Sequence, residues 1–234
     1  MPRRLLLALA GAAAVLGLAA CAPASPGIPG SVVPGSVVPG PVAPGEVVVP
    51  GEVVPAEPTR AVDGAVAIGS GPIVIDAWVD FFCPYCRMFE EGNGEYLRTL
   101  VEQDRATLRV HPIAILDRAS MGTEYSTRAA NAFVCVAEYA PSETLDFMEA
   151  LYANQPPEST PGRSDEELAA FAPAAAAECI GDGRFAEWVG DWTAAALDAG
   201  VRATPTILVN GTQYRGALDG PAFRDFVSGL TAAL

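Results

Sequence analysis

The order of hydrophobic and polar positions predicts one folded domain of mixed strands and helices, from about residue 62 to residue 234. The segment GPIVIDAWVDFF, residues 71–82, is almost continuously apolar and predicts a buried strand that carries two aspartates. A second strand is predicted at ATLRVHPIAIL, residues 106–116. Helical periodicity predicts a helix from Pro84 to about residue 104, and a long helical stretch without strand signals from 120 to about 199.

Shorter signals complete this order. AVDGAVAIGSG, residues 61–71, predicts a first short strand, and TPTILVNG, residues 204–211, predicts a strand that enters an Asn-Gly turn with TQYRGAL as its hairpin partner. Ser164 and Glu167 form a capping-box pattern inside the helical stretch, and Asp219 is predicted to cap the last helix. The predicted order is therefore strand, helix, strand, helices, strand, strand, helix. An α/β thioredoxin fold with an inserted helical subdomain has this order.

The first twenty residues predict a signal peptide. MPRR supplies positive charge, and the apolar run LLLALAGAAAVLGLAA is too short and too rich in alanine and glycine to span a membrane comfortably. The run ends in Leu18-Ala19-Ala20-Cys21, which resembles a bacterial lipobox. That resemblance implies cleavage before Cys21 and lipid on its sulfur; the alternative is an ordinary signal peptide in which Cys21 lies near the cut by chance.

Residues 21–61 differ in composition from the domain that follows. A G-x-V-V-P unit recurs, and its prolines lack the N–H that a strand donates to its neighbour. A sheet would lose ladder bonds in every unit, so a disordered or polyproline-like tether is predicted. The alternative is an adhesive stalk at the cell wall. The predicted organisation is therefore a signal peptide in 1–20, a lipidated cysteine and tether in 21–61, and the domain in 62–234.

The charge balance excludes some classes of partner. The chain has a formal net charge of −14, from 28 acidic and 14 basic residues. An acidic surface without basic clusters argues against nucleic acid and against anionic lipid headgroups as partners. Contact with a membrane would have to come from the lipid on Cys21.

Four cysteines remain in the domain: Cys83, Cys86, Cys135 and Cys179. An exported protein resides in an oxidising compartment, so an even count indicates two disulfides, and pairing Cys83 with Cys86 leaves Cys135 with Cys179. The alternative for the second pair is two buried free thiols. A zinc site is disfavoured because it needs four ligands, whereas the chain offers only His111 beside these cysteines.

The spacing of Cys83 and Cys86 favours a disulfide that exchanges over one that only stabilises. Cys83 is predicted at the first turn of a helix, where unpaired N–H groups and the helix dipole favour a thiolate, and Pro84 suits the first helical position. The pKa of Cys83 should therefore be lowered. Cys86, one turn further on, should be the more buried thiol.

These motifs together resemble a DsbA-type thiol–disulfide oxidoreductase of the thioredoxin superfamily, over most of residues 62–234. The resemblance rests on a strand ending in F-x-C-P-Y-C at the head of a helix, the helical insertion, and the late TPTILVNG. YSTRAANAFVCVAEYAP and GVRATPTILVNG resemble in particular the exported DsbA-like proteins of actinobacteria. The resemblance implies that Cys83 is the nucleophile and Cys86 the resolving thiol. It also implies that Pro205 is a cis-proline beside the active site and that the backbone of Thr204 pairs with a bound substrate segment.

The sequence departs from the family at Ala77, six residues before Cys83, where many thioredoxin-fold enzymes carry a buried acid. Asp80, three residues before Cys83, resembles a variant of the exported subgroup, and proton handling during exchange is predicted to involve either Asp80 or water. Tyr85 either tunes the redox potential or is an exposed aromatic residue of little consequence. Trp78 and His111 are predicted to be structural.

The resemblance implies an exported enzyme, lipid-anchored to the outer face of the cell membrane, that forms disulfides in secreted or envelope proteins. Its expected partners are reduced exported proteins and a membrane quinone-linked reoxidase of the DsbB or vitamin K epoxide reductase type. No cofactor, metal or nucleic acid is expected, and the protein should be monomeric. Two alternatives stay open: a reductase or isomerase of envelope disulfides, and a surface-binding lipoprotein on a redox-inactive scaffold.

Overall fold

The computed structural model describes residues 46–49 and 52–232. The predicted signal peptide, the lipidation site Cys21 and most of the predicted tether lie outside these residues.

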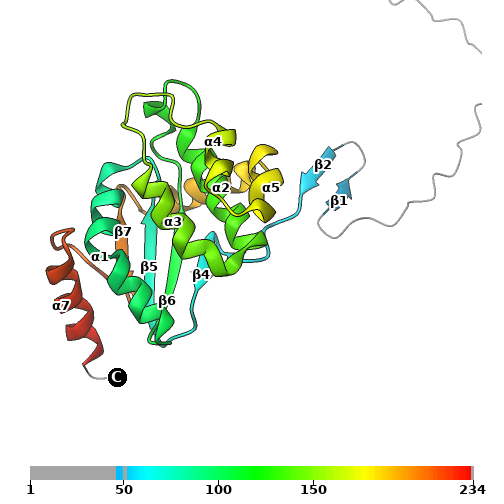
Figure 1. Cartoon of the computed structure of the whole chain (residues 1–234). Coiled ribbons are helices and arrows are strands. Elements are labelled where there is room, and N and C mark those ends of the chain that lie inside the picture. Colours follow the sequence, from blue (N-terminus) through cyan, green and yellow to red (C-terminus); the bar gives the residue numbers. More distant parts are fainter. Residues whose placement is uncertain (1–45, 50–51, 233–234) are drawn as a thin grey trace, which may run out of the picture. The chain divides into compact units, whose positions relative to one another are not determined.

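The domain is built on one six-stranded sheet (Figure 1). The strand order is β3-β4-β6-β5-β7-β8, and the long central strands β5 and β6 run parallel while the other neighbours pair antiparallel. The strands are β3 (Ala61–Val62), β4 (Ala65–Ile68), β5 (Ile73–Val79), β6 (Ala106–Pro112), β7 (Thr206–Val209) and β8 (Thr212–Gln213). The predicted strands are all present.

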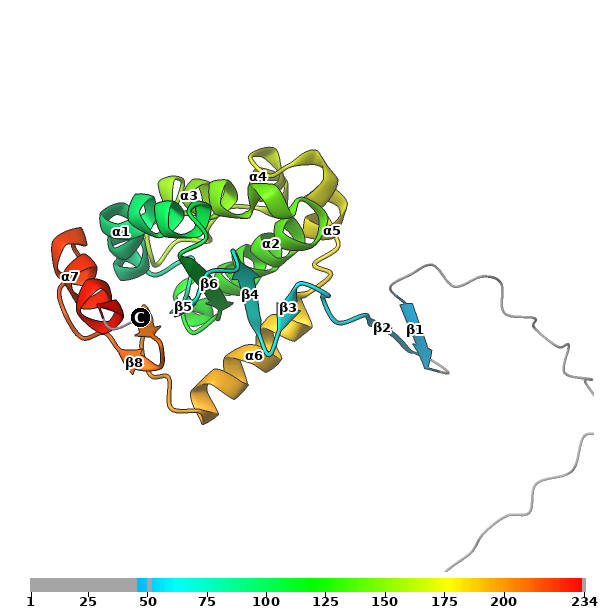
Figure 2. The same cartoon turned by 90° about the horizontal axis from the view of Figure 1, so that it is seen from below.

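Helices cover both faces of this sheet, with α1 and α3 on one side and α6 on the other (Figure 2). The helices are α1 (Pro84–Glu102), α2 (Tyr125–Tyr139), α3 (Thr144–Ala153), α4 (Asp165–Ala170), α5 (Ala177–Gly181), α6 (Ala186–Asp198) and α7 (Gly220–Thr231), with short 3-10 turns η1 (Asp117–Ala119), η2 (Pro141–Glu143) and η3 (Ala174–Ala176). Helices α2 to α6 form the predicted insertion, and the capping box of Ser164 and Glu167 begins α4 as predicted. Among the described residues, no helix is long and apolar enough to cross a membrane.

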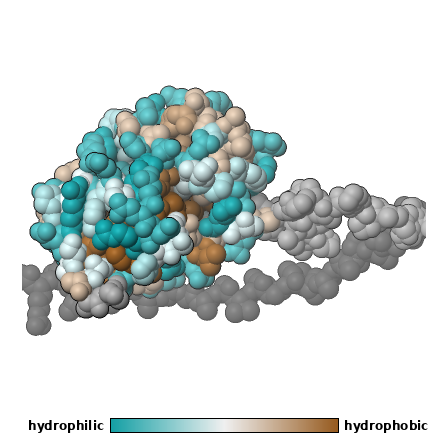
Figure 3. Space-filling view, turned by 60° about the horizontal axis from the view of Figure 1, so that its bottom comes forward, coloured by the Kyte–Doolittle hydropathy of each residue, from teal (hydrophilic) through white to brown (hydrophobic). Residues whose placement is uncertain are grey.

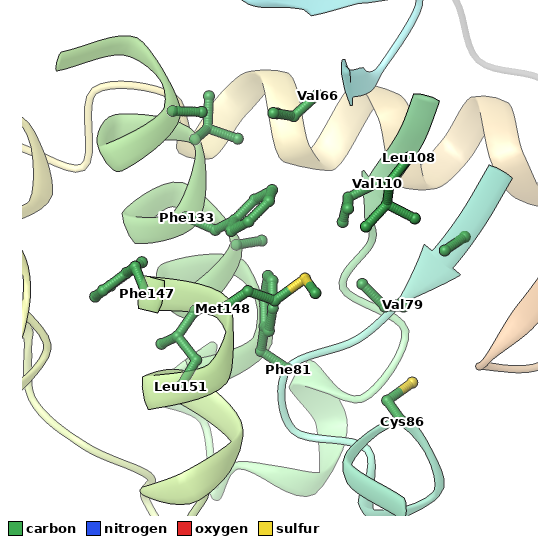
Figure 4. Close-up of a cluster of buried hydrophobic side chains, with 14 of the residues drawn as sticks. Val66, Val79, Phe81, Cys86, Leu108, Val110, Phe133, Phe147, Met148 and Leu151 are labelled. Carbon is green, nitrogen blue, oxygen red and sulfur yellow. The ribbon is translucent and has the colours of Figure 1, made fainter. Parts of the chain in front are cut away.

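The main core lies between the sheet and the helices α1, α2 and α3. Alternate residues of β5 point to this side, and Ile75, Ala77 and Val79 are buried there. Figure 4 shows Val79 and the β6 residues Leu108 and Val110 facing aromatic and aliphatic side chains of the insertion. On the surface shown in Figure 3, hydrophobic residues form separate patches within a largely hydrophilic face.

Close contact between α1 and the start of α7 fixes the position of the helix that carries the cysteines. A Cβ on Gly92 would lie 2.9 Å from the carbonyl oxygen of Leu218, so only glycine allows this approach. The neighbouring Asn93 donates a hydrogen bond to the same carbonyl at 2.8 Å. Asp219 occupies the N-cap position of α7, but its side chain makes no capping hydrogen bond, so the predicted cap is wrong in that respect.

Two segments differ from the sequence prediction. The strand predicted over TQYRGAL is only two residues long; the N–H of Tyr214 still donates to the carbonyl of Ile207 at 2.9 Å, and its ring packs against Phe223 and Phe226 of α7. Within the predicted tether, β1 (Glu46–Val49) and β2 (Glu52–Pro55) pair as an antiparallel ladder. The prediction that proline prevents pairing is wrong for these residues, because the strands consist mainly of valine and their only proline lies at a strand end.

Candidate active site

The cysteine pair lies at the start of α1, four residues after the end of β5. Cys83 is the N-cap residue of α1, with extended φ and ψ of −77° and 119°, and Pro84 occupies the first turn. The N–H of Cys83 donates to the carbonyl of Asp80 at 3.0 Å, and the N–H of Cys86 donates to the carbonyl of Cys83 at 3.1 Å. The predicted start of the helix is therefore confirmed. Both thiols are free, so the structure is that of the reduced pair.

Residues more than a hundred positions later complete the site. The antiparallel pairing of Trp78 on β5 with Thr206 on β7 brings the end of β5 next to the segment before β7. There the Sγ of Cys83 donates to the backbone carbonyl of Thr204 at 3.4 Å. The Thr204–Pro205 bond is cis, as the resemblance implied. The structure thus brings Cys83, Thr204 and Pro205 together.

The two thiols have opposite acidities. A hydrogen bond from the Cys86 side chain, with smaller contributions from Thr204 and from backbone N–H groups, lowers the pKa of Cys83 to about 6 against the opposing effect of burial. Burial raises the pKa of Cys86 well above its ordinary value, and the neighbouring Cys83 raises it further. Cys86 is also the more buried thiol, with 1% of its surface exposed against 5% for Cys83. Both predicted directions agree with the structure, but the largest cause of the lowered pKa of Cys83 is the Cys86 side chain, and the helix N–H groups contribute less.

Asp80 is completely buried beside the cysteines, and both of its oxygens accept backbone hydrogen bonds. Oδ1 accepts from the N–H of Phe82 and Oδ2 accepts from the N–H of Leu116, each at 2.9 Å. Burial raises the pKa of Asp80 to about 7. These contacts give Asp80 a structural role, tying the turn after β5 to the segment after β6. Its role in proton handling stays a prediction.

Gln155, just beyond the end of α3, supports the active-site turn and was missed by the sequence reasoning. Its Nε2 donates to the carbonyl oxygens of Phe81 at 2.9 Å and Cys83 at 3.0 Å. The inserted subdomain therefore holds the backbone of the nucleophile directly. No motif or spacing marks Gln155, because a lone glutamine in a loop has no sequence signature of such a contact.

Tyr85 and Met88 are the exposed large hydrophobic residues at the start of α1. Their exposed fractions are 60% and 50%, respectively. This agrees with the interpretation of Tyr85 as an exposed aromatic residue, while its effect on the redox potential stays a prediction. Together the two side chains place an apolar surface beside Cys83.

Trp78 and His111 pack on the α6 side of the sheet. Their rings stack with centroids 4.1 Å apart, and the Nε2 of His111 lies 3.0 Å from the Oδ1 of Asp76. Arg109 approaches the same oxygen at 3.1 Å. His111 is thus held by structural partners, which confirms its predicted role; Trp78 is only partly buried.

A disulfide joins Cys135 of α2 to Cys179 of α5, with an S–S distance of 2.01 Å. Both residues are buried in the inserted subdomain. The predicted second disulfide is confirmed. It leaves Cys83 and Cys86 as the free thiols of the described residues.

Comparisons with known proteins agree with this fold. Residues 63–228 match the family Thioredoxin_4, described as thioredoxin. The chain is similar to a disulfide bond oxidoreductase, DsbG, from Mycobacterium tuberculosis, with 29% identity, a TM-score of 0.62, and coverage of 72% of this chain and 88% of that one. DsbA from Mycobacterium tuberculosis in its reduced form gives 27% identity and a TM-score of 0.58, with coverage of 72% and 100%.

A second similarity, found from the sequence alone, covers a smaller part of this chain. The serine/threonine-protein kinase PknE of Mycobacterium tuberculosis is 34% identical over 125 residues, which cover 51% of this chain. The match spans only 22% of the length of PknE.

The chain therefore belongs to the thioredoxin family. Within it, the sheet order, the inserted helices and the neighbouring thiols are those of a DsbA-like thiol–disulfide oxidoreductase.

Proposed function

We propose that this protein forms disulfides in secreted or envelope proteins through the pair Cys83-Pro84-Tyr85-Cys86, and that it acts while tethered to the outer face of the cell membrane. The observation that carries the proposal is the opposite acidity of the two thiols. One is poised as a thiolate near pH 7 and the other is buried and kept neutral. A thiol with a low pKa is both a good nucleophile and a good leaving group in disulfide exchange.

In the oxidised enzyme, a substrate thiolate attacks the Sγ of Cys83, which is the more exposed of the two sulfurs. A bond forms between the substrate sulfur and Cys83, the Cys83–Cys86 bond breaks, and Cys86 leaves with the electron pair and takes up a proton. A second substrate thiolate then attacks the substrate sulfur of the mixed disulfide and releases Cys83 as a thiolate. The substrate has lost two electrons and the enzyme has gained them.

The surroundings of Cys83 suit a protein substrate. The backbone of Thr204, just before Pro205, would pair with an extended substrate segment, and the exposed side chains of Tyr85 and Met88 provide apolar contact area. Return to the disulfide requires an acceptor of two electrons. We propose a membrane quinone-linked protein of the DsbB or vitamin K epoxide reductase type, and a lipid on Cys21 would keep the domain close to it.

The activity is tested with the full chain carrying Cys21→Ser, oxidised and mixed with a reduced, unfolded protein of known disulfide pattern. We expect disulfides to form in the substrate and one enzyme dithiol to appear per disulfide formed. Cys83→Ser in the same background should abolish the transfer. A Cys83–Cys86 couple as reducing as thioredoxin, about −270 mV, would instead indicate the reductase alternative.

The membrane anchor is tested separately. Wild-type protein from bacterial cells should partition into a detergent phase and carry covalent lipid, whereas Cys21→Ser should stay in the aqueous phase. Equal partitioning of the two proteins would refute the anchor and leave the redox activity untouched.

A further inference from the structure

A groove of about 470 Å³ lies between α1 and α3, and the exchange steps above leave it without a role. Figures 1 and 2 both show these two helices side by side. The floor of the groove is apolar, because Leu97 and Met148 are buried there and Leu145 is partly buried. Four acidic residues and one basic residue also line it: Glu90, Glu91, Glu95, Glu149 and Arg98. The groove therefore combines an apolar floor with a largely acidic wall.

The basic residues at this groove are already paired with acids of the chain. Arg98 lies 2.7 Å from Asp146 and 3.3 Å from Glu149, so its single charge is shared between two carboxylates of α3. Arg87, one turn before Glu91, approaches the carboxylate of that residue at 3.6 Å. These pairs leave negative charge in the groove that the chain itself does not compensate.

The uncompensated charge belongs to Glu90 and Glu95, which form no ion pair within the described part of the chain. Glu95 is exposed, whereas Glu90 is partly buried. Burial raises the pKa of Glu90 to about 7, and the charge of Glu149 raises it further, against a decrease from Arg98. Carboxylates that repel each other across a groove are stabilised by a cation placed between them.

A buried hydroxyl also lies at this groove without a partner. Tyr152 of α3 lines the groove with 3% of its surface exposed, and its hydroxyl forms no hydrogen bond to the described residues. An unpaired buried hydroxyl is costly, and an ammonium or guanidinium group that enters the groove would supply the missing donor. A Cβ on Gly94 would lie 2.5 Å from the Oε1 of Glu90, so the glycine provides the space for this carboxyl group.

The arrangement of the acids favours an extended ligand over a single ion. Glu91 and Glu95 are one helical turn apart, about 6 Å along α1. Among the residues that the structure describes, no group of three or more potential ligands could hold a metal ion. Lysine and arginine side chains fit this groove, because their alkyl stems cover apolar surface while their charged ends reach acids at its edge.

One end of the groove lies next to the active-site turn. Tyr152 lines the groove, and Gln155, three residues further on, donates to the carbonyl oxygen of Cys83 at 3.0 Å. Glu90 and Glu95 follow Cys83 by seven and twelve residues, which correspond to about 10 and about 18 Å along α1. An extended chain covers about 3.3 Å per residue, so these acids lie about three to six residues away from a cysteine that reacts at Cys83.

We propose that the groove between α1 and α3 is a second binding site for the substrate, which holds lysine or arginine side chains of a reduced protein while a nearby cysteine of the same protein reacts with Cys83. The proposal rests on the proposed function and leaves its exchange steps unchanged. It defines a substrate class, namely proteins with basic residues about three to six positions from a reactive cysteine. The groove contributes affinity for these substrates and takes no part in the chemistry.

The test measures how fast synthetic peptides reduce the oxidised full chain in a Cys21→Ser background. Each peptide has about 13 residues and one central cysteine, with lysine, glutamine or glutamate at the fourth and sixth positions on either side. Two peptides lose two electrons and join as a disulfide, and the Cys83–Cys86 pair gains the electrons. The reaction of each peptide with oxidised glutathione measures the intrinsic reactivity of its thiol and corrects the rate constant.

We expect the corrected second-order rate constant of the lysine peptide to exceed that of the glutamine peptide by about 5- to 20-fold, as several ion pairs at a partly exposed site would produce. The difference should appear as a lower half-saturation concentration, while the maximal rates of the two peptides should be similar. The glutamate peptide should be the slowest of the three. Added salt should reduce the preference for lysine, because it screens exposed charges.

Two double variants separate the groove from the general attraction of an acidic protein for a basic peptide. Glu95→Gln with Glu149→Gln should reduce the preference for lysine to about twofold or less. Glu187→Gln with Asp191→Asn removes the same charge from exposed positions of α6, on the other side of the sheet, and should keep the full preference. Tyr152→Phe removes only the unpaired hydroxyl and should lower the preference in part.

Equal rate constants for the lysine and glutamine peptides would overturn the proposal, and so would an equal loss of preference in the two double variants. Tight binding of spermine in titration calorimetry, without a preference for the lysine peptide, would instead identify a site for small polyamines. These results leave the proposed function standing as long as the glutamine peptide reduces the Cys83–Cys86 disulfide. A disulfide that no peptide reduces would refute the proposed function itself.

Discussion

Replacing Cys86 by alanine should raise the pKa of Cys83, because the hydrogen bond from the Cys86 side chain is the largest cause of its low value of about 6. The perturbation is local: Cys86 is buried with 1% of its surface exposed, and alanine removes only the Sγ atom. The contributions of Thr204 and of the backbone N–H groups should remain. The experiment therefore separates one hydrogen bond from the other effects at the helix N-terminus.

The expected size follows from the energy of a hydrogen bond to a charged group, about 1.5 to 3 kcal/mol, which equals about 1 to 2 pKa units. The pKa of Cys83 should then rise from about 6 to roughly 7 or 8. At pH 6 the thiolate fraction should fall from about one half to about one tenth or less. The rate of alkylation by iodoacetamide should fall in proportion, because only the thiolate reacts.

The assay uses a Cys21→Ser background, so that Cys83 is the single thiol outside the disulfide in the Cys86→Ala variant. Thiolate absorbance and alkylation rate are both followed against pH. Cys86→Ser is the control: it also removes the resolving thiol, but its hydroxyl keeps a donor near Cys83, so its pKa should rise less. Equal values for wild type and Cys86→Ala would refute the assignment of the low pKa to this hydrogen bond.

Three further predictions concern stability. Replacing Cys135 and Cys179 by serine should lower the free energy of unfolding by at most about 4 kcal/mol, because their bond spans a separation of 44 residues, and an unchanged urea midpoint would contradict this. Gln155→Ala should cost about 1 to 3 kcal/mol and speed amide hydrogen exchange in the active-site turn, since two backbone carbonyls lose their donor. The raised pKa of Asp80 means that the folded state keeps a proton which the unfolded state releases above about pH 4. Stability should therefore fall as the pH rises from 4 to 7, with a shallower slope in Asp80→Asn under urea denaturation.

The reactive end of α1 could be predicted from the sequence because its determinants are local. A buried strand, a cysteine and a proline at the first helical position fix where the helix begins, and the burial of Cys86 follows from helical geometry. The cysteine count likewise led to the bond between Cys135 and Cys179. The proximity of Pro205 to Cys83, in contrast, came from the family resemblance, because hydrophobic periodicity does not determine which strands are neighbours.

The features that were missed depend on how separate elements pack. Glu90 and Glu91 are adjacent acids on one helix, and only the packing of α3 against α1 decides that one is partly buried while the other is exposed. Gln155 reaches the active-site turn only because α3 ends beside it. The pairing of β1 with β2 was missed because the recurring prolines of the segment argue against a sheet, whereas the valines of these two short strands favour one.

The opposite acidities of the two thiols bear on the direction of electron flow. At pH 7 an ordinary thiol is protonated, so the raised pKa of Cys86 leaves the balance between dithiol and disulfide almost unchanged, and only the shift of Cys83 counts. A pKa of about 6 favours the dithiol by about tenfold at that pH, which makes the couple about 30 mV more oxidising. Thioredoxin and DsbA differ by about 150 mV, so a strong oxidase needs further interactions that act on the dithiol alone. The hydrogen bonds of Cys83 with the side chains of Cys86 and Thr204 are already included in this shift, because they are what lowers its pKa, so a potential near that of DsbA would require interactions beyond these two.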